Sequence, residues 1–203
     1  MRRIITLSAL AALATLVLVW GGMAHEQVPA VDGIVSDGEY ANHYTNKDLN
    51  MKVHWTVDTK EGVIYIALEA PTQGWVGIGF DFKAQDKKSM GMDWIIGAFH
   101  DKDGETDTLD AFQVKSGEPA QADTFLGGKD DIMEKAAVQT EKETTLEFTR
   151  LLDTGDKFDV ALKPGAQGTM LAFGDEDEYK HFHQESLTMV MIDFFTGKVG
   201  KGK

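Results

Sequence analysis

Residues 87–99, "KKSMGMDWIIGAF", join a charged loop to an apolar strand. Residues 92–99 are nearly all apolar, which is typical of a central strand of a β-sandwich. The loop half places Met90 and Met92 on either side of Gly91 at the start of that strand. Methionine is unusual in a polar loop, so these thioethers are either adaptable packing groups or ligands.

A period of two, typical of half-buried strands, recurs outside this stretch. In residues 51–57, "MKVHWTV", Met51, Val53 and Trp55 fall on one face, and Lys52 and His54 fall on the other. Similar stretches, separated by Gly, Asp, Asn and Lys clusters, predict strands at 62–71, 74–80, 107–114, 144–152, 168–174 and 187–195. Strands at this spacing predict an all-β antiparallel sandwich. Residues 115–143 are less regular, and we expect a helical turn within 129–139.

The chain begins with a secretory leader pattern. Two arginines precede the apolar run of residues 4–20, and small residues follow it. We expect a signal peptide over 1–24, cleaved after Ala24, and one domain over 25–203 that is periplasmic or secreted. The alternative is an uncleaved anchor, since the apolar run is only slightly short for a membrane span.

Composition excludes several classes of function. The formal charge of −13 makes nucleic acid an unsuitable partner, because phosphate binding needs a basic surface. The chain has no cysteine, which rules out disulfides, covalent haem attachment, iron–sulfur clusters and thiolate zinc. No nucleophile elbow, zinc-protease helix or phosphate loop occurs, so we expect a protein that is not an enzyme.

Several motifs, in order, resemble one known family. They are "AVDGIVSDGEYAN" (30–42), "GWVGIGF" (74–80), "GMDWIIGAF" (91–99), "LGGKDDI" (126–132), "TTLEFTRLLDTGD" (144–156), "AFGDEDEYKHFH" (172–183) and "IDFF" (192–195). Their order and spacing over residues 31–195 resemble the exported bacterial members of the DOMON domain family. The resemblance implies an immunoglobulin-like β-sandwich with a ligand pocket, which in some members holds b-type haem and in others is thought to hold sugars.

The haem-binding members, such as the cytochrome domain of cellobiose dehydrogenase, hold the iron between a methionine before a strand and a late histidine. That resemblance implies non-covalent haem b ligated by Met90 and His183, with both ligands brought together at one end of the sandwich. Met92 and His181 remain the alternatives, because each lies two residues from the preferred ligand. Methionine and histidine together are a sound ligand pair for an electron-transfer iron.

The remaining candidates concern the pocket and other ligands. Trp75, Trp94 and Gly91 suit a flat ligand such as a porphyrin or a sugar ring. The expected function is electron transfer with a redox partner protein or a membrane electron-transfer component. The alternatives are a binding module for carbohydrate or another small ligand, and a divalent-metal or structural protein. The acidic turns at 101–105 and 127–131, and Asp93, are candidates for calcium through oxygen ligands.

Overall fold

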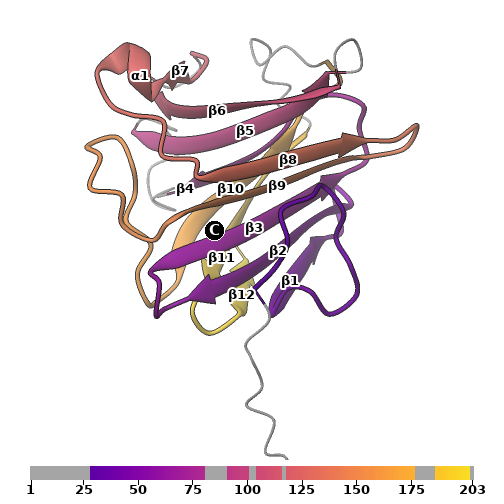
Figure 1. Cartoon of the computed structure of the whole chain (residues 1–203), viewed down its shortest axis with the longest axis horizontal. Coiled ribbons are helices and arrows are strands. Elements are labelled where there is room, and N and C mark those ends of the chain that lie inside the picture. The colour runs from indigo at the N-terminus through magenta and orange to yellow at the C-terminus, as the bar shows by residue number, and fades with distance from the viewer. Residues whose placement is uncertain (1–27, 81–90, 101–103, 116–117, 177–185, 202–203) are drawn as a thin grey trace, which may run out of the picture.

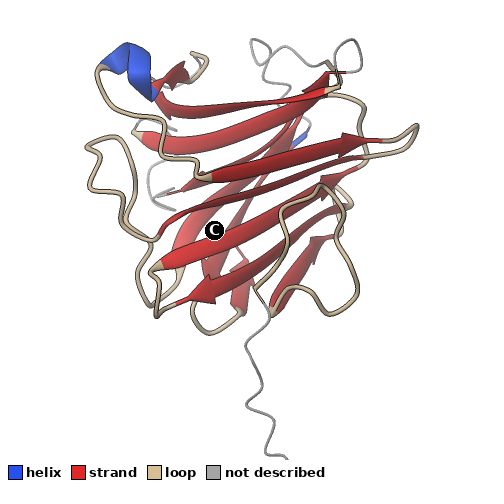
Figure 2. Ribbon diagram, viewed as in Figure 1, coloured by secondary structure: helices blue, strands red, loops and turns tan. Residues whose placement is uncertain are grey.

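The computed structural model describes residues 28–80, 91–100, 104–115, 118–176 and 186–201. Two antiparallel sheets face each other and form a β-sandwich (Figure 1). Strands dominate the described chain, and the helix α1 (Asp123–Leu126) is a single turn (Figure 2). The expected all-β antiparallel sandwich is therefore confirmed.

The smaller sheet has five strands in the order β1-β2-β3-β9-β8. They are β1 (Asn42–Asn46), β2 (Met51–Asp58), β3 (Val63–Ala70), β8 (Glu134–Gln139) and β9 (Thr144–Leu151). The alternation expected for β2 is confirmed, since Met51, Val53 and Trp55 are fully buried.

The larger sheet has seven strands in the order β12-β11-β10-β4-β5-β6-β7. They are β4 (Val76–Phe80), β5 (Met92–His100), β6 (Glu105–Gln113), β7 (Gln121–Ala122), β10 (Gln167–Phe173), β11 (Leu187–Asp193) and β12 (Lys198–Lys201). The hairpin β4–β5 pairs Gly79 with Trp94 at the centre of this sheet.

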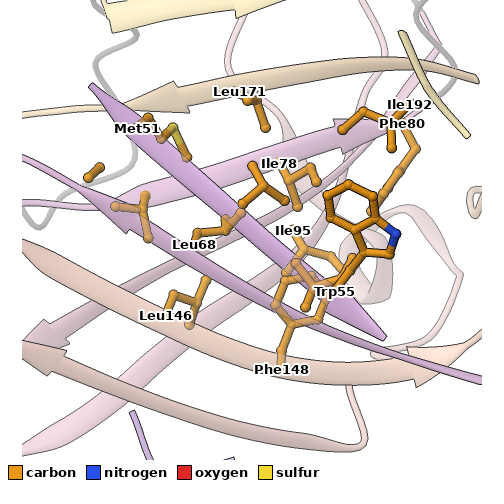
Figure 3. Packing of buried hydrophobic residues seen from close by; sticks show 14 of the residues in the cluster. Met51, Trp55, Leu68, Ile78, Phe80, Ile95, Leu146, Phe148, Leu171 and Ile192 are labelled. Atoms are coloured by element: carbon orange, nitrogen blue, oxygen red, sulfur yellow. The ribbon is translucent and has the colours of Figure 1, made fainter. Parts of the chain in front are cut away.

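The main core fills the space between the two sheets. The smaller sheet contributes Met51, Trp55, Leu68, Leu146 and Phe148, and the larger one contributes Ile78, Phe80, Ile95, Leu171 and Ile192 (Figure 3). The rings of Phe80 and Phe194 meet edge to face with centroids 6.0 Å apart. Trp55 donates its indole N–H to the carbonyl of Phe194 at 2.9 Å, which satisfies a polar group inside the core.

Strand β5 is buried on both faces. Ile95 points into the main core, whereas Met92, Trp94 and Ile96 belong to a second buried cluster on the opposite face of the larger sheet. Burial on both faces explains why residues 92–99 show no alternation between apolar and polar residues.

The segment around Asp32 and Gly33 is fixed against the side of the smaller sheet that points away from the main core. The carboxylate of Glu147, a fully buried residue of β9, accepts backbone N–H groups of Asp32 at 2.9 Å and Gly33 at 2.7 Å. The Tyr40 hydroxyl donates to the same carboxylate at 2.7 Å. Burial, together with the Glu147 hydrogen bond, raises the pKa of Tyr40 far above its usual value.

Some sequence expectations were wrong. Residues 129–139 form no helical turn; they contain strand β8, and the helix α1 lies earlier, at Asp123–Leu126. The short strands β1, β7 and β12 were not expected, because their residues are mostly polar and lie toward the edges of the two sheets. The expected signal peptide lies outside the described residues. Within the described residues, no helix is long and apolar enough to cross a membrane.

Candidate functional site: an apolar sheet face and a buried acidic cluster

The face of the larger sheet that points away from the smaller sheet carries a second apolar cluster. We call it the outer face, made up of Trp75, Met92, Trp94, Ile96, Ala98, Ala111, Met170 and Ala172. Met92 is 1% exposed, Trp75 1% and Trp94 2%. A sheet face that is both apolar and buried on the far side of the main core is a place where a ligand or a covering segment packs.

Two glycines of β4 lie on this outer face. A Cβ atom at Gly79 would lie 2.6 Å from the sulfur of Met92 and 3.0 Å from Trp94, and one at Gly77 would lie 3.2 Å from Ile96. The glycines therefore let the side chains of β5 pack directly over the β4 backbone. Glycine within a strand commonly marks such a close approach of another group.

Gly91 begins the turn into β5. Its φ of 77° lies in the left-handed region, which explains why glycine occupies the position. Its N–H donates to the carbonyl of Gln113 at 2.9 Å, which joins the start of β5 to the end of β6. Met90 comes directly before Gly91 and lies outside the described residues.

Trp75 lies at the other end of the sheet. The backbone N–H of Trp75 donates to the carbonyl of Glu176 at 3.1 Å, and the backbone carbonyl of Trp75 accepts the N–H of Gly174 at 3.0 Å. The segment that follows Glu176 contains His181 and His183, which also lie outside the described residues.

The two segments that carry the expected iron ligands join the larger sheet at opposite ends. Residues 81–90 connect Phe80 to Gly91, at the end of the sheet where Phe80 pairs with Thr169. Residues 177–185 lead into β11, whose Leu187 pairs with Ala172 near the end where Phe173 pairs with Val76. The hairpins β4–β5 and β10–β11 open in opposite directions. The expectation that both ligands come together at one end of the sandwich concerns residues outside the described ones and stays a prediction.

A buried ion pair lies on the interior side of β5. The Arg150 guanidinium of β9 donates to Asp93 Oδ2 at 2.9 Å, and their side chains are 1% and 0% exposed. The same guanidinium donates to the Val160 carbonyl at 3.0 Å and lies 5.3 Å from the centroid of Phe80. Asp93 also accepts the Val160 N–H at 2.9 Å, so it caps a loop amide as well as pairing with Arg150.

Other carboxylates gather beside Asp93. We call Asp93, Asp110, Asp123, Asp131 and Asp159 the acidic cluster; each has at least one buried carboxylate oxygen without a hydrogen-bond donor among the described residues. Burial raises the pKa of Asp93 to about 6, of Asp110 to about 8 and of Asp123 to about 7. The Arg150 charge opposes this rise for Asp93 and Asp123.

Sequence reasoning named Asp93 and the 127–131 turn but missed Arg150, Asp110 and Asp159. A signal existed, because Arg150 follows Leu146 and Phe148 at period two and must point into the same core. Asp159 lies in a loop, and only the fold brings it to the cluster. Of the other calcium candidate, the turn at 101–105, residues 101–103 lie outside the described residues.

A polar pocket of about 410 Å³ lies against the smaller sheet. Its lining includes Tyr40, His43, Lys52, His54 and Glu69. His54 Nε2 lies 2.6 Å from Glu69 Oε2, and the Lys52 ammonium lies 3.0 Å from the other oxygen. These two partners hold the pKa of Glu69 below its usual value, with the His54 hydrogen bond as the largest cause.

Comparison with known proteins identifies the family. The chain is 28% identical over 130 residues to the fruit fly (Drosophila melanogaster) protein MOXD1 homolog 1, a match that spans 61% of this chain and 17% of that relative. Among solved structures, the cytochrome b domain of pyranose dehydrogenase from Coprinopsis cinerea is similar, with a TM-score of 0.51 and 11% identity over 77% of this chain and 83% of that one. The cytochrome domain of Myriococcum thermophilum cellobiose dehydrogenase has a TM-score of 0.45 and 10% identity over 73% of this chain and 85% of that one. The DOMON domain family matches residues 47–174, which is more than half of the sequence. The chain therefore belongs to the DOMON domain family.

Proposed function

We propose that this DOMON domain binds b-type haem without a covalent bond and transfers electrons as an exported protein. The observation that carries the proposal is the outer face, a buried apolar surface on the sheet whose strands flank, in sequence, the segments that contain Met90 and His183. The likeness of the fold to a cytochrome b domain supports the choice of haem over other flat ligands.

The described residues fit a haem in their chemistry. A porphyrin needs an apolar surface for its ring, and the outer face consists of tryptophan, methionine, isoleucine and alanine side chains without a charge. Gly77 and Gly79 carry no side chains, so Met92, Trp94 and Ile96 pack over the β4 backbone and complete this apolar face. Aromatic and thioether groups make favourable contacts with a polarizable ring.

Met90 and His183 are the proposed axial ligands. Their segments connect β4 to β5 and β10 to β11, and all four strands belong to the sheet that carries the outer face. Met92 remains the alternative methionine, but its sulfur packs against Gly79 in a buried position. His181 remains the alternative histidine. A bound haem supplies one-electron transfer, and methionine–histidine ligation raises its reduction potential.

The protein's own contribution would be to bind the cofactor and exclude water from it. We propose that it is not itself an enzyme and that it passes electrons to or from a redox partner protein or a membrane component. A formal charge of −13 favours a partner with a basic docking surface.

Ligand substitution tests this assignment. The full chain is produced with haem supplied, and the variants M90L, M92L, H181Q and H183Q are compared by visible spectroscopy. Loss of the six-coordinate spectrum in M90L and H183Q is expected, with little change in M92L and H181Q. The matched controls are M51L, a buried methionine of the main core away from the outer face, and H43Q, an exposed histidine. Loss in M92L with M90L unaffected would reassign the methionine ligand.

A second candidate function is a binding module for a carbohydrate or another small polar ligand. The polar pocket around His54 and Glu69 favours it, because its histidine, lysine and carboxylate groups suit hydroxyl ligands. Trp75 and Trp94 do not decide between the two candidates, since both rings are buried and either flat ligand would have to reach them. Saturable glycan binding by the full chain that H54A abolishes, without any haem spectrum, would favour this candidate over haem.

A further inference from the structure

The acidic cluster brings carboxylates from separate parts of the chain to one end of the core. Asp93 lies on β5, Asp110 on β6 and Asp123 on α1. Asp131 precedes β8, and Asp159 lies in the connection between β9 and β10. A group of acids alone is no evidence for a site, so the positions and partners of their oxygens decide the question.

Three of these residues have the geometry of a cation site. Asp93, Asp110 and Asp159 each offer one oxygen, and these oxygens all lie within 4.8 Å of one another. Calcium binds oxygen at about 2.4 Å, so two ligands on opposite sides of the ion are about 4.8 Å apart. One calcium ion can therefore contact all three carboxylates.

Each of these three residues has at least one carboxylate oxygen that accepts no hydrogen bond from the described residues. Asp93 uses Oδ2 for Arg150 and Val160, which leaves Oδ1 unpaired. Asp110 uses Oδ2 for the Asp131 N–H at 2.8 Å, which leaves its Oδ1 unpaired. Both oxygens of Asp159, whose side chain is 2% exposed, lack a hydrogen-bond donor. Buried carboxylate oxygens without donors are strongly unfavourable, so three such carboxylates within reach of one ion indicate a positive ligand.

The charge of the cluster is not balanced by its neighbours. In the described part of the chain, Arg150 is the basic side chain that bonds directly to these acids. The exposed Lys129 opposes the rise in the pKa of Asp131 that burial causes. Asp123 is 1% exposed and has no donor for either side-chain oxygen, so it adds to the negative charge from the α1 side.

We propose that Asp93, Asp110 and Asp159 bind a calcium ion, with Asp123 and Asp131 as further oxygen donors. Calcium takes six to eight oxygen ligands in flexible geometry, whereas magnesium prefers an octahedral shell in which it retains water. The cluster contains no nitrogen or sulfur ligand, which disfavours zinc and copper.

The site connects to the outer face through β5. Asp93 lies between Met92 and Trp94 in sequence, and its side chain points to the opposite side of the sheet. A calcium ion would fix the start of β5 to β6 and to the 153–160 loop, directly beneath the outer face. The proposal does not depend on haem, because every ligand is on the interior side of the sheet.

Calorimetric titration of the full chain with calcium chloride, after EDTA treatment and dialysis, tests this proposal. We expect saturable binding of one ion, much weaker binding of magnesium, and a melting temperature raised by roughly 5 °C in saturating calcium. D159N should weaken calcium binding at least about tenfold and remove the thermal shift, because a neutral amide is a poorer calcium ligand. D153N is the matched control, since it changes an exposed acid in the same loop and should bind calcium normally.

D123N provides a second variant in case D159N does not fold, since the Asp123 side chain accepts no hydrogen bond from the described residues. Terbium luminescence excited through tryptophan and displaced by calcium gives an independent measurement. An absence of calcium binding and of a thermal shift in the unmodified chain would overturn the proposal, and would mean that the carboxyls share protons instead. Equal effects of D159N and D153N would also overturn it, because binding would then lie elsewhere.

Discussion

Replacing Arg150 with methionine tests how the two sheets are joined at the acidic cluster. Methionine retains much of the apolar contact with Phe80 but removes the charge that lies 5.3 Å from that ring. It also removes the 2.9 Å bond to Asp93 and the 3.0 Å bond to the Val160 carbonyl. Asp93, fully buried, would lose its cationic partner, which typically destabilises a protein by about 3–5 kcal/mol.

The loss of folding stability in R150M should depend on pH. Burial raises the pKa of Asp93 to about 6, and Arg150 opposes that rise, so R150M raises the pKa further. Above about pH 7 the unmodified protein holds a charged Asp93, and the variant must protonate it or bury an unpaired charge. Near pH 5 the carboxyl is largely protonated in both proteins, so the difference should shrink.

Urea unfolding at pH 5 and pH 8 in EDTA measures the effect. The K157M control removes an exposed positive charge of the 153–160 loop and should change the free energy of unfolding by less than about 0.5 kcal/mol. A loss for R150M under about 1 kcal/mol at pH 8, or an equal loss at both pH values, would refute the reasoning.

The remaining predictions concern the outer face, the segment around Asp32 and Gly33, and the cluster. G79A should destabilise the fold by about 1–3 kcal/mol in urea, because its Cβ would lie 2.6 Å from the Met92 sulfur; an unchanged midpoint would mean that the outer face repacks freely. E147Q should cost about 1–3 kcal/mol and expose the segment around Asp32 to limited proteolysis, whereas the exposed control E141Q should do neither. In EDTA, the free energy of unfolding should fall as pH rises from about 4 toward 8. Folded Asp110, with a pKa of about 8 against the usual 3.8, keeps a proton that the unfolded chain has lost over this range, so each rise in pH favours unfolding. Each such group contributes up to about 1.4 kcal/mol per pH unit, and a rise in stability over this range would contradict the pKa direction.

Much of the sandwich could be predicted from sequence because burial leaves a simple pattern in strands. The alternation in β2 identified a strand with one buried face, and the unbroken apolar run in β5 identified a strand buried on both faces. Strand β8, by contrast, was expected as a helical turn. Its sequence, "EKAAVQ", is rich in helix-forming residues, and pairing with β9 overrides that preference.

The candidate sites could be predicted less well than the strands. The sequence named Trp75 and Trp94 as candidate pocket residues and Met92 as an alternative iron ligand, and the structure places all three on the outer face. It could not show that the flanking segments join the sheet at opposite ends, because strand order is a property of long-range pairing. The acidic cluster was missed for the same reason, since its members come from five separate parts of the chain.

The visible spectrum of the full chain, produced with haem supplied and recorded oxidised and then reduced with dithionite, tests the central claim most directly. We expect a Soret band and, on reduction, a sharp α band typical of six-coordinate b-type haem held by methionine and histidine. A chain that folds, as judged by circular dichroism, but shows neither band would contradict haem binding.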